Sequence, residues 1–319
     1  MAKIIDLVTN AGQVDVTRGI VEEALAAVPE MQFFDADVIA GTVINTLARV
    51  SLPTVAFRNI GEPVSSTRSG YEMRPATLKM LSGRAELSDA EVLANGLQTK
   101  DEQLVSEAVA VLIAAFQTLA KQIWTGADAK GFTSAMSLVD AAMVTRAGDG
   151  ATNANTSVWF VGNGAKTKCG ILFSKNSGIL SDADLEFRHG DIAIKGEDGK
   201  VTGVEPGWIG DLTSYAGFHV ANKKTLARLC NVTAATGLND DMLTDCIEAY
   251  MKENNGAKPD GIFMSHNARK MLRKSRNLSI AKVAGGTLSA YAPIPADIDG
   301  IPIFATAAIL DTEATVAAA

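Results

Sequence analysis

The stretch ARVSLPTVAFRNIGEPVSSTRSGYEMRPATLKMLSGRA, residues 48–85, decides the architecture of this chain. Three prolines that a long helix cannot pass interrupt it: Pro53, Pro63 and Pro75. Two pieces, 54–58 and 76–81, are typical of strands and flank a Ser/Thr/Gly tip at residues 65–70. The stretch therefore predicts an extended hairpin. Because an isolated two-stranded hairpin is marginal in water, we expect it to lie on its own domain or on another subunit.

The predicted hairpin also carries charges of both signs. These charged residues are Arg58, Glu62, Arg68, Glu72 and Arg74. On so thin an element, opposite charges either pair across the two strands of one chain or form ion pairs with a neighbouring subunit. The sequence leaves both interpretations open.

Residues 101–124, which follow the hairpin, show the strongest helical pattern in the chain. Apolar residues recur there at steps of three and four: Val105, Val109, Leu112, Phe116, Leu119 and Ile123. Gly126 is a suitable residue to end this helix. At a rise of 1.5 Å per residue the helix is a rod of about 36 Å. Its wide apolar stripe predicts burial along one full side.

The rest of the chain divides into an arm, a β-rich stretch and an α/β stretch. Residues 1–30 predict an arm with a short amphipathic helix that Pro29 stops. Residues 148–232 contain several strand-like runs between Gly- and Asn-rich turns. The last third predicts two helices and two strands: a helix over 239–253, a strand over 260–264, a helix capped by Ser265 or Asn267 and running to Arg276, and a strand over 300–305. We expect the alanine-rich tail to be frayed.

Composition limits the class of protein. The chain has 319 residues, of which 47% are hydrophobic, enough for a core in one large domain or two ordinary ones. Its net charge of −7 argues against a tight, sequence-independent nucleic-acid binder, although a local basic patch is still open. No run of 18 apolar residues and no signal-peptide core are present, so we expect a cytosolic protein with no membrane partner.

Motifs for catalysis or for cofactor and metal binding are missing from the sequence. Residues 162–167, GNGAKT, resemble a phosphate-binding loop, but the first glycine is absent and alanine precedes the lysine, so we expect a β-turn. The histidines and cysteines are scattered without metal-ligand spacing: His189, His219, His266, Cys169, Cys230 and Cys246. We therefore expect a protein that is not an enzyme, with no catalytic, cofactor-binding or metal site, and cysteines that serve as small hydrophobic residues.

One dense cluster of basic residues stands out near the C-terminus. Its members are Arg269, Lys270, Arg273 and Lys274. Residues four apart share a helix face, so the cluster forms two pairs of stacked cations. One interpretation is a solvated helix whose cations lie toward its C-terminal end. The other is a contact patch for an acidic neighbour or for nucleic acid.

An arm, a proline-punctuated hairpin, a long rod and an α/β block follow one another in this order, and with them the sequence resembles the major capsid proteins of tailed phages, which have the Hong Kong 97-type fold. The match covers nearly the whole chain and depends on the order of its pieces. The stretches that carry it are LPTVAFRNIGE (52–62), KMLSGRAEL (79–87), SVWFVGNG (157–164), GI (170–171), GW (207–208), RLCNV (228–232), GIPI (300–303) and AAIL (307–310).

The resemblance implies an α+β chain with an extended loop, a peripheral domain and an axial domain. The implied boundaries are an N-terminal arm over 1–30, a peripheral domain over 31–47 and 88–134 with its spine helix at 101–124, an extended loop over 48–87, an axial domain over 135–295 with a β-rich insertion at about 148–232, and a final strand and tail over 296–319. In this family the extended loop lies across the neighbouring subunit.

The resemblance also implies the function. It indicates a structural coat protein that self-assembles through pentamers and hexamers into an icosahedral shell around a phage double-stranded DNA genome. Implied partners are scaffold, decoration and portal proteins, with weak non-specific contact to DNA, in a virion capsid assembled in the host cytoplasm. No motif for the lysine–asparagine crosslink of some relatives is present. Two alternatives are an encapsulin-like cellular compartment, which shares the fold, and a cytosolic α/β enzyme, against which the missing motifs argue.

Overall fold

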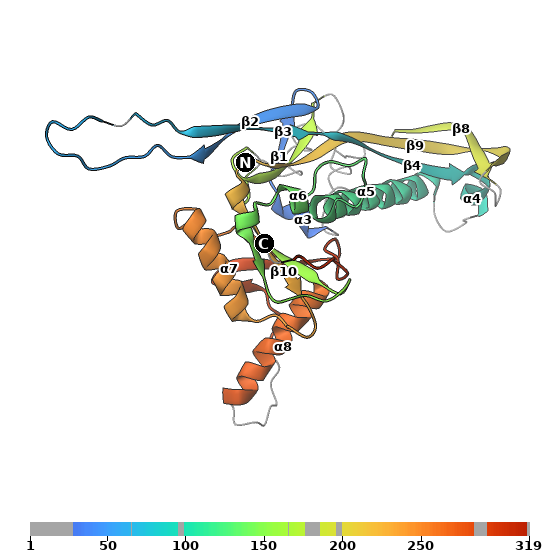
Figure 1. Cartoon of the computed structure of the whole chain (residues 1–319). Helices are drawn as coiled ribbons and strands as arrows, with labels where there is room; N and C mark the ends of the chain where they lie inside the picture. The colour runs from blue at the N-terminus through green and yellow to red at the C-terminus, as the bar shows by residue number, and fades with distance from the viewer. Residues whose placement is uncertain are drawn as a thin grey trace.

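A computed structural model describes most of the chain, in seven segments. The described residues are 28–64, 66–94, 99–164, 166–175, 186–195, 200–283 and 292–317. The predicted arm therefore lies outside them, apart from its last three residues. The described chain forms an upper and a lower lobe, and a thin ribbon projects from the upper lobe to the left in Figure 1.

The upper lobe is built on a five-stranded sheet. Its strands are β1 (Ala36–Ile39), β4 (Lys79–Ser88), β7 (Cys169–Ser174), β8 (Glu186–Lys195) and β9 (Val201–Val220). The order is β1-β7-β9-β4, and β8 also pairs with β9. Strand β9 has 20 residues, so it carries β4 along one side while β7 and β8 share the other. Strands β8 and β9 pair in antiparallel fashion, in the stretch that the sequence predicted to be rich in strands.

Helix α5 (Lys100–Thr125) underlies this sheet as the predicted rod. Thr99 accepts a hydrogen bond from the Glu102 backbone while the Glu102 carboxylate reaches back to Thr99, which is a capping box. Gly126 ends the helix in the left-handed conformation, at φ 65°. The buried apolar face of α5 joins the core of the upper lobe through Ala108, Leu112, Ala115, Phe116, Leu119, Ala120, Ile123 and Trp124.

Helix α5 is also long and apolar enough to cross a membrane by length and composition, and among the described residues it is alone in this. The core helix of a globular protein passes the same test. Because α5 places its apolar face against β4 and β9, its composition is explained by burial in the core.

The lower lobe is built on a six-stranded sheet with two helices on one face. The strands are β5 (Val144–Arg146), β6 (Thr156–Val161), β10 (Leu226–Val232), β11 (Gly261–Ser265), β12 (Asp297–Ile298) and β13 (Ile301–Thr306). Their order is β12-β13-β11-β6-β10-β5. Helices α7 (Asp240–Glu253) and α8 (His266–Val283) cover this face. Of the two caps predicted for α8, Ser265 is the one that the structure shows, and Asn239 caps α7.

Alternation along the central strands of this sheet separates two cores. Val158 and Phe160 of β6 point toward α7 and α8, whereas Trp159 on the same strand points toward α5 and the short helix α3 (Pro29–Phe33). The six-stranded sheet is thus buried on both faces. The two lobes are joined by this shared sheet rather than by a single linker.

The ribbon, residues 43–77, is the feature in which the structure differs most from the prediction. Strands β2 (Val43–Ser51) and β3 (Gly70–Thr77) form their own two-stranded sheet, and the described residues of 52–69 continue beyond it without a ladder. The strand predicted over 54–58 was wrong, because Pro53 lacks an N–H and no strand among the described residues pairs with this segment.

The second predicted strand of the hairpin, 76–81, is divided between β3 and β4, and β4 pairs with β9. The β-rich stretch 148–232 is divided in the same way. Strands β6 and β10 belong to the lower lobe, whereas β7, β8 and β9 belong to the upper one. These strands therefore do not form one inserted unit.

Candidate inter-subunit surfaces

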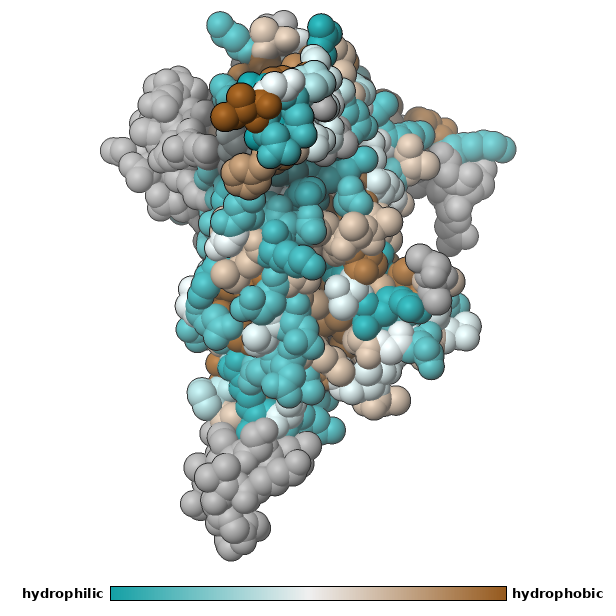
Figure 2. Space-filling view, turned by 60° about the vertical axis from the view of Figure 1, so that its left-hand side comes forward, coloured by the Kyte–Doolittle hydropathy of each residue, from teal (hydrophilic) through white to brown (hydrophobic). Residues whose placement is uncertain are grey.

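The ribbon exposes large apolar side chains that nothing in the described part of the chain covers. Those beyond the two strands are Leu52, Val55, Phe57, Ile60 and Val64. Phe57 and Ile60 are fully exposed. Figure 2 turns the ribbon toward the viewer at the top of the molecule, and hydrophobic side chains lie there among hydrophilic ones.

Covering these side chains would release a large amount of free energy. Burying one such side chain stabilises a contact by roughly 1.5–3 kcal/mol. A soluble monomer rarely exposes several large apolar side chains next to one another. Patches of this kind mark interaction sites. The ribbon is therefore the strongest candidate for a surface that another molecule covers.

Two of the predicted contact residues, Arg58 and Glu62, organise a turn in the ribbon. The Glu62 carboxylate accepts hydrogen bonds from the Asn59 backbone N–H at 2.9 Å and from the Asn59 amide at 3.1 Å. These bonds hold the pKa of Glu62 below its usual range. Arg58 donates to the Glu62 carbonyl oxygen, and Gly61 supplies the positive φ of 96° that the turn requires. The turn presents Ile60 outward.

The other three predicted contact residues differ in their surroundings. Glu72 and Arg74 form a 2.8 Å ion pair on the same strand, so their pairing is within a strand and not across the hairpin. This bond lowers the pKa of Glu72. Arg74 also donates to the Ala221 carbonyl oxygen at 3.4 Å. Within the described residues Arg68 makes no ion pair, which leaves its charge available to a neighbour.

Side chains, and not a backbone ladder, hold the root of the ribbon to the upper lobe. Thr46 on β2 is hydrogen-bonded to Nε2 of His219 on β9 at 3.0 Å. Burial, and secondarily the charge of Arg74, lower the pKa of His219, so the ring is neutral at pH 7. The ribbon is thus a separate two-stranded element that is attached at its root, through Thr46 and Arg74.

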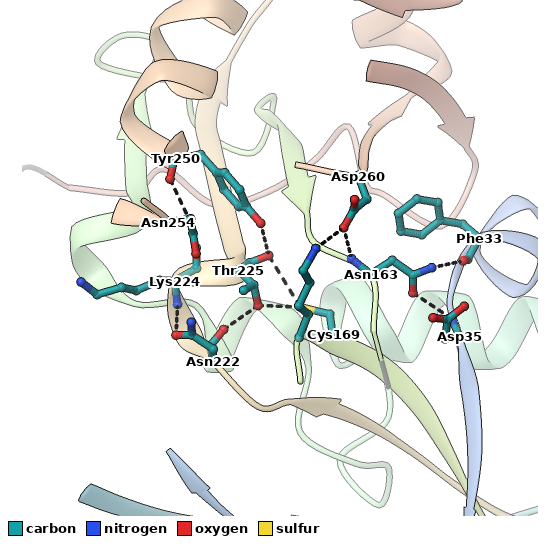
Figure 3. A network of polar contacts seen from close by, with 11 residues as sticks. Phe33, Asp35, Asn163, Cys169, Asn222, Lys224, Thr225, Tyr250, Asn254 and Asp260 are labelled. Carbon is teal, nitrogen blue, oxygen red and sulfur yellow. Dashed lines mark hydrogen bonds and ion pairs between the residues drawn. The ribbon is translucent and has the colours of Figure 1, made fainter. Parts of the chain in front are cut away.

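The loop that resembles a phosphate-binding motif connects the two lobes. Asn163 accepts a hydrogen bond from the Asp35 backbone N–H at 2.8 Å and donates to the Phe33 carbonyl oxygen at 2.9 Å. Its own backbone N–H donates to Asp260, which also pairs with Lys168 at 2.7 Å. Figure 3 shows Asn163 between Asp260 on one side and Phe33 and Asp35 on the other. The expected β-turn is therefore a joint between segments far apart in sequence.

The three cysteines are buried and unpaired, as expected for small hydrophobic residues. Cys169 lies beside Thr225 in the same view, with its sulfur 3.7 Å from the Thr225 carbonyl oxygen. Burial raises the pKa of Cys169 to about 12 and that of Cys246 to about 11. Such thiols are poor nucleophiles at neutral pH. Within the part of the chain that the structure describes, no group of three metal-ligating side chains comes together.

The C-terminal tail, expected to be frayed, is docked on the lower lobe through residue 317. Glu313 is buried and accepts from the Arg228 guanidinium at 2.9 Å and from the Ser157 hydroxyl. Asn231 bonds Val316 through both its amide and its carbonyl oxygen. Sequence reasoning missed this contact because its partners are 85 or more residues away; the polar residues spaced through 311–315 were the signal available.

The four residues of the predicted basic patch do not act alike. The Arg273 guanidinium donates to the Ala292 carbonyl oxygen at 2.9 Å, so it is used within the chain. Arg269 is half-buried. Lys270 and Lys274 are exposed and line an open groove of about 750 Å³ between α8 and the start of α7.

Comparisons with known proteins agree on one family. A family model described as "Major capsid protein GP7" matches residues 19–317. Among curated proteins, none matches the sequence significantly. The fold is similar to that of bacteriophage Epsilon15, with 20% identity, a TM-score of 0.60 and coverage of 89% of this chain and 88% of that chain.

Two further solved structures are similar to a lesser degree. The bacteriophage JBD30 capsid has 11% identity and a TM-score of 0.50, over 89% of this chain and 92% of that chain. An encapsulin complex from Synechococcus elongatus has 9% identity over 63% of this chain and 85% of that chain. Its TM-score is 0.39.

Proposed function

Because this chain belongs to the family of the major capsid protein GP7, a family of structural shell proteins, we propose that it assembles through pentamers and hexamers into an icosahedral shell around a phage double-stranded DNA genome. The Hong Kong 97-type fold expected from the sequence agrees with the similarity to the Epsilon15 and JBD30 structures. The chain is a capsid protein. We propose how many copies assemble and how they are grouped.

The uncovered ribbon is the observation that carries this proposal. An apolar strip held away from both cores has a clear role if a second copy covers it. A closed shell reuses one chain through heterologous contacts, in which different surfaces of two copies meet. We therefore place the ribbon of each subunit across its neighbour, with Phe57 and Ile60 as the apolar anchors.

The charges of the ribbon would then fix its register on the neighbour. Arg68 supplies a cation that its own chain leaves unpaired among the described residues. Arg58 and Glu62 hold the turn that presents Ile60, and Glu72 and Arg74 hold the root, so these four act mainly by ordering the element. Exposed ion pairs contribute little affinity, about 0–1 kcal/mol each, so the apolar anchors dominate.

The remaining assignments follow the family. The upper lobe with α5 corresponds to the peripheral domain with its spine helix, and the lower lobe corresponds to the axial domain. We propose that the protein resides in the virion capsid after assembly in the host cytoplasm, that it has no catalytic role and no membrane partner, and that scaffold, decoration and portal proteins are its partners. With a net charge of −7, contact with packaged DNA would be weak and non-specific.

Negative-stain microscopy and light scattering on the intact chain test the proposal, with the chain expressed alone and with the genes that flank it. We expect closed particles, or rings of five and six, and DNA inside particles from the native host; protein cargo there would favour a cellular compartment. A chain that stays monomeric in both settings would contradict the shell function.

A matched pair of variants tests the ribbon separately. Phe57→Ser with Ile60→Ser should abolish assembly while leaving the melting temperature unchanged, because neither side chain contacts a core. The control, Leu93→Ser with Val204→Ser, removes two exposed apolar side chains from the upper lobe and should assemble. Normal particles from the ribbon variant would show that the contact lies elsewhere.

A further inference from the structure

A buried histidine lies where the ribbon meets the upper lobe. His219 of β9 is 3% exposed, and its Nε2 is hydrogen-bonded to the Thr46 hydroxyl of β2 at 3.0 Å. Arg74 of β3 is the ladder partner of Thr46 and donates to the Ala221 carbonyl oxygen at 3.4 Å. Strand β3 lies against β9 here, at the base of the ribbon in Figure 1. The ribbon therefore covers an ionisable side chain of the upper lobe.

The face of the ribbon that is turned toward the lobe makes two successive contacts. Side chains two residues apart on a strand share a face, so Ile44 lies on the same side of β2 as Thr46. Ile44 and its ladder partner Ala76 pack on the small apolar cluster formed by Ile39, Leu78 and Leu172. The contact with His219 is one residue pair further out along the ribbon. The apolar cluster thus attaches the ribbon, and the contact with His219 fixes its direction.

The charges near His219 disfavour a second cation. Arg74 and Lys223 line the same cavity as His219, which has a volume of about 170 Å³. Lys223 belongs to the short helix η3 (Lys223–Thr225). Glu72 lines the cavity too, but its carboxylate is already bound to Arg74 at 2.8 Å. Asp140 is the other acidic group nearby, and its charge acts on Glu72.

The remaining elements around His219 add no charge toward the ring. Strand β7, which pairs with this part of β9, carries no charged residue. Tyr215, on the same face of β9, packs against the small apolar cluster. Burial first, and then the charge of Arg74, lower the pKa of His219 from its usual 6.5. A protonated ring is therefore disfavoured as long as the ribbon covers it.

We propose that His219 fixes the direction of the ribbon at neutral pH and releases the ribbon in mild acid. A protonated ring could still donate to the Thr46 hydroxyl, so the hydrogen bond itself does not oppose protonation. The cost comes from burying a second cation beside Arg74, and lifting the ribbon removes this cost by letting water reach the ring. Ile44 and Ala76 keep the ribbon attached, so the change is a loss of direction and not a detachment.

The direction of the pH effect follows from the lowered pKa of His219. The ring of a lifted ribbon titrates near 6.5, whereas the covered ring titrates lower. The contact is therefore at full strength above pH 6.5 and weakens as the pH falls below this value. From there down to the lowered pKa, the ratio of lifted to seated ribbons rises by up to about tenfold for each pH unit.

The consequence for assembly rests on the proposed function, whereas the hinge is a property of the single subunit. A ribbon that lies across a neighbouring copy has to leave its own lobe in one direction. Acid should therefore slow assembly by spreading the ribbons over many directions before they meet a neighbour.

A distance measurement on dilute, unassembled subunits tests the inference. Nitroxide labels at Tyr71→Cys on the ribbon and Lys121→Cys on α5 report its direction, and the three natural cysteines are buried. Pulsed electron paramagnetic resonance should give a narrow distance distribution at pH 7.5 and a wider one at pH 5.5, with a midpoint below pH 6.5. The same distribution at both pH values would overturn the inference.

Three variants of the labelled chain identify the group that titrates. His219→Gln keeps a neutral hydrogen-bonding partner for Thr46, so its distribution should stay narrow at both pH values. The matched control, His189→Gln, changes an exposed histidine of the same lobe and should respond to pH as the natural chain does. Arg74→Gln removes the neighbouring charge but keeps an amide donor, so its midpoint should move to higher pH.

A His219→Gln chain that still widens only in acid would show that another group titrates, which overturns the inference. If His219→Gln is wide already at pH 7.5, Arg74→Gln decides, because an unchanged midpoint would overturn the inference as well. All of these outcomes are read on single subunits and leave the shell function untouched. Failure of the natural chain to assemble at pH 7.5 would instead count against the proposed function.

Discussion

At the scale of single residues, Glu30 is the ionisable group under the greatest constraint. It is fully buried at the start of α3, and the Trp124 indole N–H donates to its Oε1 at 2.8 Å. Burial raises the pKa of Glu30, and its hydrogen bonds only partly offset this. An ionised carboxyl in such a place costs free energy that a neutral one does not.

Replacing Glu30 with glutamine should therefore change how stability depends on pH. A carboxyl whose pKa is raised by folding stabilises the protein fully below its unfolded pKa, near 4.5, and loses that contribution as pH rises through the folded pKa. We expect Glu30→Gln to match the natural chain at pH 4 and to melt at a higher temperature at pH 7, as measured by scanning calorimetry. Equal melting temperatures at both pH values would show that Glu30 does not carry this cost.

The buried pair of Arg228 and Glu313 gives a second prediction. Removing one partner leaves an unpaired buried charge, so Glu313→Ala should lower the free energy of unfolding by about 3–5 kcal/mol. Replacing both, with Arg228→Met and Glu313→Leu, should cost less, because no charge is left alone. Denaturant unfolding measures both. A double variant less stable than the single one would show that the pair itself, and not the stranded charge, matters.

At this scale the sequence predicted the roles of residues that act on their immediate neighbours in the chain. Gly126 and Ser265 were read correctly as helix caps because a cap acts within three residues. Asn163 and Glu313 were not identified as anchors, since their partners lie up to 158 residues away and nothing in the neighbouring sequence indicates them.

At the scale of elements, the ribbon is separable from the rest of the subunit. Ile44 and Ala76 near the root of the ribbon pack on a small apolar cluster. Beyond Ser51 and Gly70, whose backbone N–H donates to the Ser51 hydroxyl at 3.0 Å, no described residue of the ribbon belongs to a core. The attachment at His219 and Thr46 lies at the opposite end of the strands. The element therefore contributes surface and little stability to the isolated chain.

Shortening the ribbon should accordingly leave the fold intact. Replacing residues 52–69 with an Asn-Gly turn, which suits a two-residue hairpin, should give a soluble subunit that melts within a few degrees of the natural chain. The same protein should fail to form particles in light scattering. Loss of the folded subunit would mean that the ribbon tip stabilises its own chain, contrary to the exposure of its side chains.

Prediction at the level of elements succeeded where periodicity was strong. Helix α5 and strand β11 were expected, because their patterns are long or wholly apolar, and β6 and β7 lie in the stretch that was expected to be rich in strands. The strand that pairs with β4 was not predicted, because β4 can pair with any strand that the fold brings beside it. Strand β9, whose residues lie 119 to 137 positions from their partners in β4, is such a long-range partner.

At the scale of the whole molecule, the structure combines two well-buried cores with one uncovered ribbon. The cores share the six-stranded sheet, so the lobes support each other without the ribbon. The order of arm, hairpin and rod indicated the family, while the division of 148–232 between two lobes required the three-dimensional arrangement. A shell built from many copies of one chain would use the lobes as rigid units and the extended ribbon as the contact to a neighbouring copy.

Cryo-electron microscopy of the particles that the intact chain forms tests the central claim most directly. We predict a closed icosahedral shell in which a neighbouring subunit covers Phe57 and Ile60 of every ribbon. A shell whose ribbons stand free in solvent, or a chain that remains monomeric when expressed with its flanking genes, would contradict it.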